Sequence, residues 1–303
     1  MTDWQWQALN TPACKLAESP RYAHGQWMWV DIDQRQLHQI AHSDPFDHST
    51  GQLVQSHALP DDIGCVLPTA DPSVLVALGR QGAWRIEFDG QTPSFQLQLA
   101  APFDSNKHRF NDGRADPTGR IWISTLVDAR SPPTAALYKI EHGHANEEIG
   151  ELIVGNGLAF SPSGHTAFLS DTRHKCIWRF RFDAKQGTLS NRTLVHQYTE
   201  GTARPDGACF SRDGSYWVAI LEGYRLDRFS EEGELLEQIA LPLAKPTMPC
   251  FGGEHGNTLM VCAAQESDSH PNRAGFEGKQ VIACTTPYFG LPEAFADAAH
   301  LQG

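Results

Sequence analysis

The chain lacks the features that mark membrane, secreted and nucleic-acid-binding proteins. None of its 303 residues falls in an apolar stretch that approaches the roughly 20 residues a membrane helix needs. The segment from Met1 to Gln7 has neither the basic start nor the apolar run of a signal peptide. The formal net charge is −12 and no basic run occurs, whereas phosphate binding needs clustered Lys and Arg. We therefore expect a cytoplasmic protein that binds neither membranes nor nucleic acids.

Three chemical signatures are also missing. The seven cysteines are an odd set without a Cys-x-x-Cys pair, so we expect reduced thiols and no disulfide framework. The sequence contains no Gly-x-Ser-x-Gly elbow, which leaves a serine hydrolase unsupported. Its glycine clusters lack the strand, helix and Lys context of a phosphate-binding loop.

What the chain does contain is a repeated strand-turn-strand pattern. A polar residue opens a short strand, a turn with glycine follows, and an apolar strand returns, as in the stretch from Arg109 to Thr125. The centres of the returning strands are spaced by 43 to 49 residues and fall at Met28, Leu75, Trp122, Phe168, Trp217 and Met260. A period in the forties with strand and turn signals is typical of a β-propeller. We predict an all-β, six-bladed β-propeller with four-stranded antiparallel blades, and a single domain over residues 1–303.

The N-terminal segment is expected to close this ring. Residues from Asp3 to Ala8 alternate between apolar and polar and include two tryptophans. An open ring would leave two unpaired strand edges. We therefore predict that this segment is the outer strand of the last blade, beside a strand near Tyr288-Phe289.

Polar or small residues recur 10 to 12 positions before the centres of the returning strands. They are Glu18, Cys65, Asn111, Asn156, Asp206 and Cys250. Because the first strand of every propeller blade lines the central channel, we expect these six side chains to form a ring.

Four members of this ring, Glu18, Asn111, Asn156 and Asp206, offer oxygen ligands with two negative charges, which suits Ca²⁺, Mg²⁺ or Mn²⁺. Four protein ligands also leave coordination positions open for water and substrate. Taken singly, Asn-Gly and Asp-Gly dipeptides are ordinary turns, and Cys65 and Cys250 are interpreted as small packed residues.

Several segments together resemble the senescence marker protein, gluconolactonase and luciferin-regenerating enzyme family. They are Glu18-Ser19-Pro20-Arg21-Tyr22, Arg109-Phe110-Asn111-Asp112-Gly113, Asn156-Gly157-Leu158, Arg204-Pro205-Asp206-Gly207 and Phe251-Gly252-Gly253. The resemblance runs in order from about residue 14 to 264, while residues 265–279 match poorly. It implies a six-bladed propeller hydrolase with one catalytic divalent metal ion, which is Ca, Zn, Mn or Mg.

The same resemblance implies roles for individual residues. Those matching Glu18, Asn156 and Asp206 bind the metal, and Asp206 also acts as catalytic acid or base. Arg109 and Asn111 meet the substrate, and Asp128 stands near the position of a further acidic substrate contact. From the residues alone, Arg109 could instead pair with Asp104 or Asp112.

These observations combine into a mechanistic hypothesis. The metal would polarise the carbonyl of a sugar-acid lactone, and an activated water would attack it while Asp206 accepts a proton. Arg109 would orient hydroxyl or carboxylate groups of the substrate. Two alternatives remain: a phosphotriester or organophosphate hydrolase at the same metal site, and a non-enzymatic Ca²⁺-binding propeller. We expect a small-molecule lactone as partner and a monomer or weak oligomer.

Overall fold

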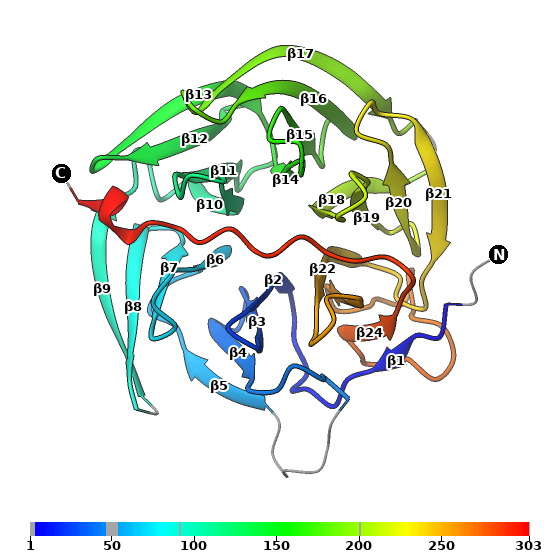
Figure 1. The fold of residues 1–303 in the computed structure, drawn as a ribbon. Helices are drawn as coiled ribbons and strands as arrows, with labels where there is room; N and C mark the ends of the chain where they lie inside the picture. Colours follow the sequence, from blue (N-terminus) through cyan, green and yellow to red (C-terminus); the bar gives the residue numbers. More distant parts are fainter. Residues whose placement is uncertain (1–3, 47–53, 91, 200, 303) are drawn as a thin grey trace.

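The computed structural model describes residues 4–46, 54–90, 92–199 and 201–302. In this part of the chain, the strands form six four-stranded antiparallel sheets arranged around a central axis (Figure 1). The predicted six-bladed β-propeller is therefore confirmed. No helix in the described ranges is long and apolar enough to cross a membrane.

The first strand of each blade lies nearest the axis, and each of these strands contacts the corresponding strands of both neighbouring blades. In order of blades, the inner strands are β2 (Ala17–Ala23), β6 (Cys65–Pro68), β10 (His108–Ala115), β14 (Gly155–Phe160), β18 (Arg204–Phe210) and β22 (Pro246–Gly252). They bring residues that are far apart in the sequence to one channel.

The second strands are the apolar triplets that defined the repeat, and they are almost completely buried between blades. They are β3 (Gln26–Asp31), β7 (Val74–Leu78), β11 (Ile121–Val127), β15 (Thr166–Asp171), β19 (Tyr216–Leu221) and β23 (Thr258–Ala263). Their tryptophans Trp27, Trp29, Trp122 and Trp217 have no exposed surface, so the apolar repeat is the core of the molecule.

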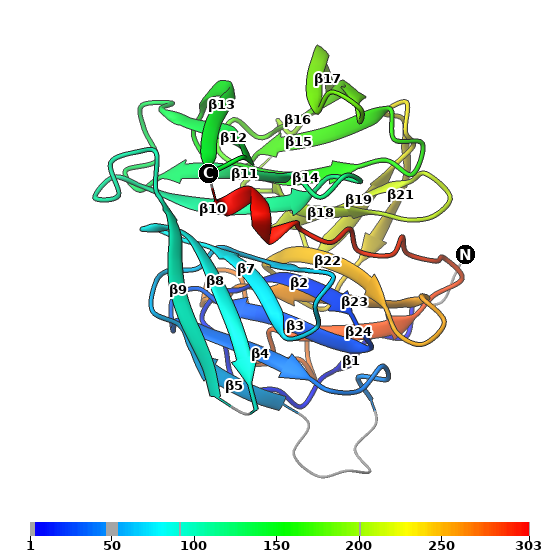
Figure 2. The same cartoon turned by 60° about the vertical axis from the view of Figure 1, so that its left-hand side comes forward.

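The third and fourth strands complete each blade towards solvent (Figure 2). The third strands are β4 (Gln36–Ile40), β8 (Gly82–Asp89), β12 (Ala135–Glu141), β16 (Cys176–Asp183), β20 (Arg225–Phe229) and β24 (Val281–Thr285). The outer strands are β5 (Val54–Ala58), β9 (Thr92–Ala100), β13 (His144–Leu152), β17 (Thr188–Gln197), β21 (Leu235–Ala240) and β1 (Gln7–Ala8).

The predicted closure by the N-terminus is confirmed, with a correction to its partner. Strand β1 pairs antiparallel with β24, with Gln7 opposite Ala283 and Ala8 opposite Ile282. The partner is therefore Val281–Thr285 and not a strand near Tyr288-Phe289. Asp3 lies outside the described residues. The tryptophans contribute by packing: Trp4 stacks on Trp6 at 5.9 Å and on Tyr288 at 6.3 Å between ring centroids.

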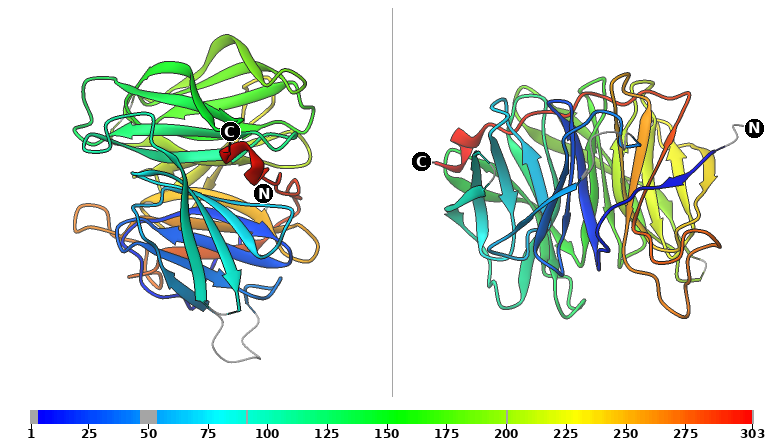
Figure 3. Two further views of the ribbon diagram at one scale, coloured as in Figure 1. Left: turned by 90° about the vertical axis from the view of Figure 1, so that its left-hand side faces the viewer. Right: turned by 90° about the horizontal axis from the view of Figure 1, so that it is seen from below.

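After β24 the chain crosses one face of the propeller as an extended segment, residues 286–302, which we call the C-terminal strap (red in Figure 1; side views in Figure 3). It bonds to several blades in turn. Gly290 bridges to Ser211, the Ala296 amide donates to the Pro68 carbonyl, and the Asp297 amide donates to the Gly119 carbonyl. The strap ends in a short 3₁₀ helix, η1 (Ala298–Leu301).

Candidate functional site

A shift in strand register recurs near the start of most inner strands. It lies between Glu18 and Arg21 in β2, Phe110 and Gly113 in β10, Asn156 and Ala159 in β14, Pro205 and Ala208 in β18, and Pro246 and Met248 in β22. Such bulges re-aim side chains and increase local twist. The four oxygen-bearing residues predicted for the ring, Glu18, Asn111, Asn156 and Asp206, are located at or inside these bulges.

Buried aspartates hold two of these strand starts in place. Asp31, at the end of β3, accepts hydrogen bonds from the Lys15 and Leu16 amides at 2.8 and 3.2 Å, just before Glu18. Asp171, at the end of β15, accepts from the Ile153 and Val154 amides at 2.8 and 3.3 Å, just before Asn156. Sequence analysis overlooked both aspartates, although each follows its apolar triplet at a similar distance.

A chain of hydrogen bonds connects the predicted site residues of two blades. Arg109 Nη1 donates to Asn111 Oδ1 at 2.8 Å, and Asn111 Nδ2 donates to Asn156 Oδ1 at 2.8 Å. Asn156 Nδ2 in turn donates to Thr172 Oγ1 at 2.8 Å. Thr172 was not predicted from the sequence. The Thr172 hydroxyl accepts from the Asn156 amide nitrogen, and this orients the Asn156 amide oxygen towards Asn111.

Glu18 and Asp206 bring negative charge to the same end of the channel. Burial raises the pKa of Glu18 well above its ordinary value, and the charge of Asp206 raises it further. Burial also raises the pKa of Asp206 to about 8, with a further contribution from the charge of Asp112. Both carboxylates are thus costly to ionise without a compensating cation.

The donor set fits a hard divalent cation. The amide oxygens of Asn111 and Asn156 each accept one hydrogen bond and retain a second lone pair. Together with Glu18 and Asp206 they offer only oxygen, as Ca²⁺, Mg²⁺ and Mn²⁺ prefer. Among the described residues, no cluster of three or more His, Cys, Asp or Glu side chains could hold a metal ion. A cation here would therefore depend on the two amides.

Arg109 is almost fully buried beside this set, with 7% of its surface exposed. Within the described ranges it forms no ion pair, so pairing with Asp104 or Asp112 is not what the structure has; Asp104 pairs with Lys107 at 3.1 Å. Gly64 makes room for it, since a Cβ at that position would come within 2.8 Å of Arg109 Nη1.

Asp128 occupies a different position from the other predicted site residues. It follows β11 directly, and its two oxygens accept hydrogen bonds from Arg80 at 2.8 and 3.2 Å. Arg80 also pairs with Asp62 at 2.9 Å. The structure thus brings Glu18, Asn111, Asn156, Asp206 and Arg109 together but engages the Asp128 carboxylate in an ion pair with Arg80. A role for Asp128 in substrate binding stays a prediction.

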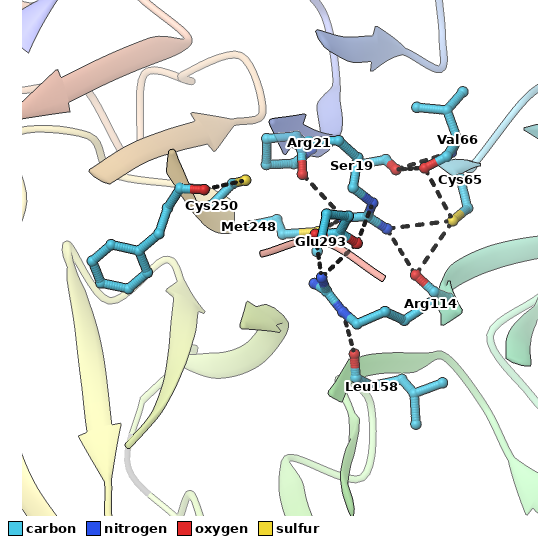
Figure 4. A network of polar contacts seen from close by, with 12 residues as sticks. Ser19, Arg21, Cys65, Val66, Arg114, Leu158, Met248, Cys250 and Glu293 are labelled. Atoms are coloured by element: carbon cyan, nitrogen blue, oxygen red, sulfur yellow. Dashed lines mark hydrogen bonds and ion pairs between the residues drawn. The ribbon is translucent and has the colours of Figure 1, made fainter. Parts of the chain in front are cut away.

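Of the two thiols predicted for the ring, Cys65 lies at the start of its strand, and Cys250 lies one level deeper in the channel. Cys65 begins β6 and contacts Arg21 and the Gly113 carbonyl (Figure 4). Cys250 pairs with Met260 in the same way that Arg21 pairs with Met28, which places it at the level of Arg21. The prediction that Cys250 belongs to the ring with Glu18 is therefore wrong. The bulge of β22 lies earlier in its strand, and a constant offset cannot follow that change.

A second polar cluster lies at the level of Arg21 in the channel and is covered by the strap. Glu293 of the strap accepts two hydrogen bonds from Arg114 Nη1 at 2.9 Å and lies 3.5 Å from Arg21 Nε (Figure 4). Arg21 is completely buried and also donates to the Gly113 carbonyl at 2.7 Å. This end of the channel is filled by paired charges, whereas the other end presents the oxygen-rich ring.

Fold and site together define a six-bladed β-propeller with a carboxylate and amide cluster at one end of its channel. The chain belongs to the family described as the SMP-30/Gluconolactonase/LRE-like region, whose profile matches residues 16–265. The family membership inferred from the motifs is therefore confirmed.

Individual relatives agree with this assignment. The chain is 37% identical over 244 residues to a 6-deoxy-6-sulfogluconolactonase of Pseudomonas putida, covering 80% of each protein. A luciferin-regenerating enzyme superimposes with a TM-score of 0.86 at 20% identity, covering 97% of this chain and 100% of the other. A calcium-binding protein, regucalcin, of Agrobacterium tumefaciens also gives 0.86, at 21% identity, covering 97% and 98%. The two structures show the fold.

Proposed function

We propose that this protein is a divalent-metal-dependent lactonase that hydrolyses the cyclic ester of a sugar acid. One observation carries the proposal: Glu18, Asp206 and the Arg109–Asn111 pair converge at one end of the channel. Membership of a gluconolactonase family and the name of the Pseudomonas putida relative support a lactone as substrate. The oxygen-only donor set supports a hard cation as cofactor.

Glu18, Asn156 and Asp206, with Asn111, would hold the cation, which when bound supplies Lewis-acid polarisation of the lactone carbonyl. Asp206 accepts a proton from the attacking water at a carboxylate oxygen while the water oxygen bonds to the carbonyl carbon. The ring C–O bond then breaks, and the leaving oxygen takes the proton from Asp206. The product is the open-chain sugar acid.

The environment of Asp206 suits this proton transfer. Burial raises the pKa of Asp206 to about 8 in the metal-free protein, and the nearby guanidiniums of Arg204, Arg130 and Arg109 moderate that increase. A cation held by Asp206 would lower this pKa, so the carboxylate would be ionised at neutral pH and would act as a weak base towards a water made more acidic by the same cation. Arg109 orients a hydroxyl or carboxylate group of the substrate through the part of its guanidinium that Asn111 leaves free.

The test combines a substrate panel with one substitution. Hydrolysis of sugar-acid lactones and of phosphotriesters is measured with Mn²⁺, Zn²⁺, Ca²⁺, Mg²⁺ and chelator, together with the metal content of the protein. We expect lactone turnover only with metal, and a loss of both bound metal and activity in Asp206→Ala. Asp89→Ala, which changes an exposed aspartate at the end of β8, is the matched control and should keep both.

Other outcomes would redirect the proposal. Turnover of phosphotriesters alone would identify the other hydrolase class, and metal binding without any turnover would favour a binding protein. Activity that survives in Asp206→Ala with metal still bound would show that Asp206 is neither ligand nor base.

A further inference from the structure

Arg109 has hydrogen-bonding capacity that the protein does not use. Its Nη1 donates to the Phe110 carbonyl at 3.0 Å and to Asn111 Oδ1 at 2.8 Å. Within the described ranges, its Nε and Nη2 make no hydrogen bond, and the guanidinium forms no ion pair. A buried guanidinium left with free donors is costly unless a ligand satisfies them.

Arg130 is a second arginine that forms no ion pair with any described residue. Arg130 belongs to the turn after β11, where its amide donates to the Val127 carbonyl at 2.9 Å, and β11 is the strand that pairs with Arg109 through Leu126. Arg130 is half-buried and has a φ of 56°, a left-handed conformation that is strained for a non-glycine residue. Among the described residues, its side chain makes one hydrogen bond, a long one of 3.5 Å from Nη1 to the Val127 carbonyl.

The chain places these guanidiniums and that of Arg173 at one end of the channel. Arg109 bonds to Asn111, Arg130 follows the strand that pairs with Arg109, and the exposed Arg173 directly follows Thr172, the hydrogen-bond partner of Asn156. The charge of Arg130 contributes to the lowered pKa of Arg109, and the charge of Arg173 to the lowered pKa of Arg130, after burial in each case. Three positive groups therefore gather at the end of the channel that carries Glu18 and Asp206.

Two neighbouring arginines, Arg80 and Arg204, differ from these three because they already form ion pairs with carboxylates. Arg80 pairs with Asp62 and with both oxygens of Asp128. Arg204 pairs with Glu222 through two bonds of 2.8 and 3.1 Å. Asp128 is the carboxylate facing Arg130 from outside the ring, and Arg80 occupies it. The positive charge of Arg109, Arg130 and Arg173 is thus left for a ligand.

We propose that Arg109, Arg130 and Arg173 form an anion subsite that binds a second charged group of the substrate, a sulfonate, phosphate or carboxylate remote from the lactone carbonyl. The inference rests on the proposed lactonase function. A lactone ring carries no charge, so a neutral lactone leaves these guanidiniums unpaired, whereas an anionic substituent pairs with them. Planar guanidiniums bind oxoanions through two parallel hydrogen bonds, which favours this chemistry over recognition of neutral hydroxyl groups.

The test measures discrimination between matched substrates. Values of kcat/KM are determined for δ-gluconolactone and for its C6-sulfonated, C6-phosphorylated and C6-carboxylate forms, and the ratio of each charged form to the neutral one is calculated. In the unchanged protein we expect at least one ratio above about 10, and the largest ratio identifies the anion. Arg130→Gln should lower that ratio about tenfold or more, and Arg173→Gln less, because exposed charges are screened.

Two further variants guard against misinterpretation. Arg130→Lys retains the charge without the planar donors and should give an intermediate ratio. Arg192→Gln removes an arginine that stacks on Trp178 at 3.7 Å in the fourth blade and should leave the ratio unchanged. A ratio near 1 in the unchanged protein, or an equal loss of both activities in Arg130→Gln, would overturn the subsite while leaving lactonase function intact.

A binding measurement separates the subsite from catalysis. Titration calorimetry compares gluconate with 6-phosphogluconate and C6-sulfonated gluconate on the full chain. Tighter binding of an acid with a second anionic group, lost in Arg130→Gln, supports the subsite even if no lactone is hydrolysed, in which case the proposed function fails alone. Equal binding of all acids by both proteins contradicts the subsite.

Discussion

Asp206 combines a charged functional group with nearly complete burial, at 5% exposed surface. Such a residue serves binding and chemistry at the expense of stability, since the folded metal-free protein prefers the protonated form. The neighbouring Asp112 is also a buried carboxylate that is costly to ionise. Burial raises its pKa too, while Arg21 and Arg114 lower it.

We predict that Asp206→Asn stabilises the metal-free protein at alkaline pH. A pKa raised in the folded state, here from 3.8 to about 8, gives stability that is complete below the ordinary pKa and lost as pH rises through 8. With chelator, the Tm of the unchanged protein should fall between pH 5 and 8 relative to the variant. At pH 8 the variant should be more stable by roughly 2–6 °C, if the unpaired charge costs about 1–3 kcal/mol.

Saturating Ca²⁺ or Mg²⁺ should reverse this order, because only the unchanged protein gains stability from the bound ion. Thermal unfolding at several pH values, with Asp89→Asn as control, measures both effects. Parallel pH dependence of Tm in the unchanged protein and in Asp206→Asn would contradict the assigned pKa.

The sequence predicted four residues of the candidate site, Glu18, Asn111, Asn156 and Asp206, from their constant position in the repeat. In a propeller, equivalent positions of successive blades lie close together around the channel. Arg130 gave no such signal. It stands two residues after Asp128, outside any repeat, and only the three-dimensional structure shows that no described carboxylate forms an ion pair with it. The same applies to Thr172, whose contact with Asn156 depends on a loop conformation.

At the scale of elements, the apolar returning strands were predictable because they are buried on both faces and therefore lack polar residues. Outer strand β13 was not, since residues His144 to Glu148 are mostly polar and show no alternation of apolar and polar side chains. The bulges were also beyond prediction. They change the number of residues between the ring and the returning strand, which is why Cys250 was misplaced.

Strand β1 contributes only two paired residues, yet we predict that its removal is costly. Deleting residues 1–8 behind a new initiating Met would leave the backbone donors and acceptors of β24 unpaired and expose Trp217 and Tyr288, against which Trp4 packs. Exposed strand edges pair with other chains. We expect a lower Tm and concentration-dependent oligomers in size-exclusion chromatography.

The full chain with Trp4→Ala and Trp6→Ala separates the two contributions. It keeps the paired strand and loses the aromatic packing together with the hydrogen bond from Trp6 Nε1 to the Ala240 carbonyl, so it should be less stable but remain unassociated. A shortened protein that stays monomeric with an unchanged Tm would show that β24 needs no partner.

At the scale of the whole molecule, the strap connects blades that are distant in the sequence, and Glu293 is its main polar contact. We predict that Glu293→Gln lowers stability by about 3–5 kcal/mol, because it leaves the buried Arg21 and the half-buried Arg114 with one counter-charge fewer. This corresponds to a fall in Tm of roughly 5–8 °C. Glu87→Gln, which removes an exposed partner of Arg85, should change Tm by less than about 2 °C.

Calorimetry of both variants measures this difference. Equal Tm values for Glu293→Gln and the unchanged protein would mean that the ion pairs of the strap do not contribute to the stability of the propeller.

The strap also bears on how substrate and product would move. Glu293, held between two arginines, fills one end of the channel, and the oxygen-rich ring lies at the other end. Under the proposed function, the lactone would enter and the acid would leave at the same end, so product release would contribute to the turnover rate at saturating substrate.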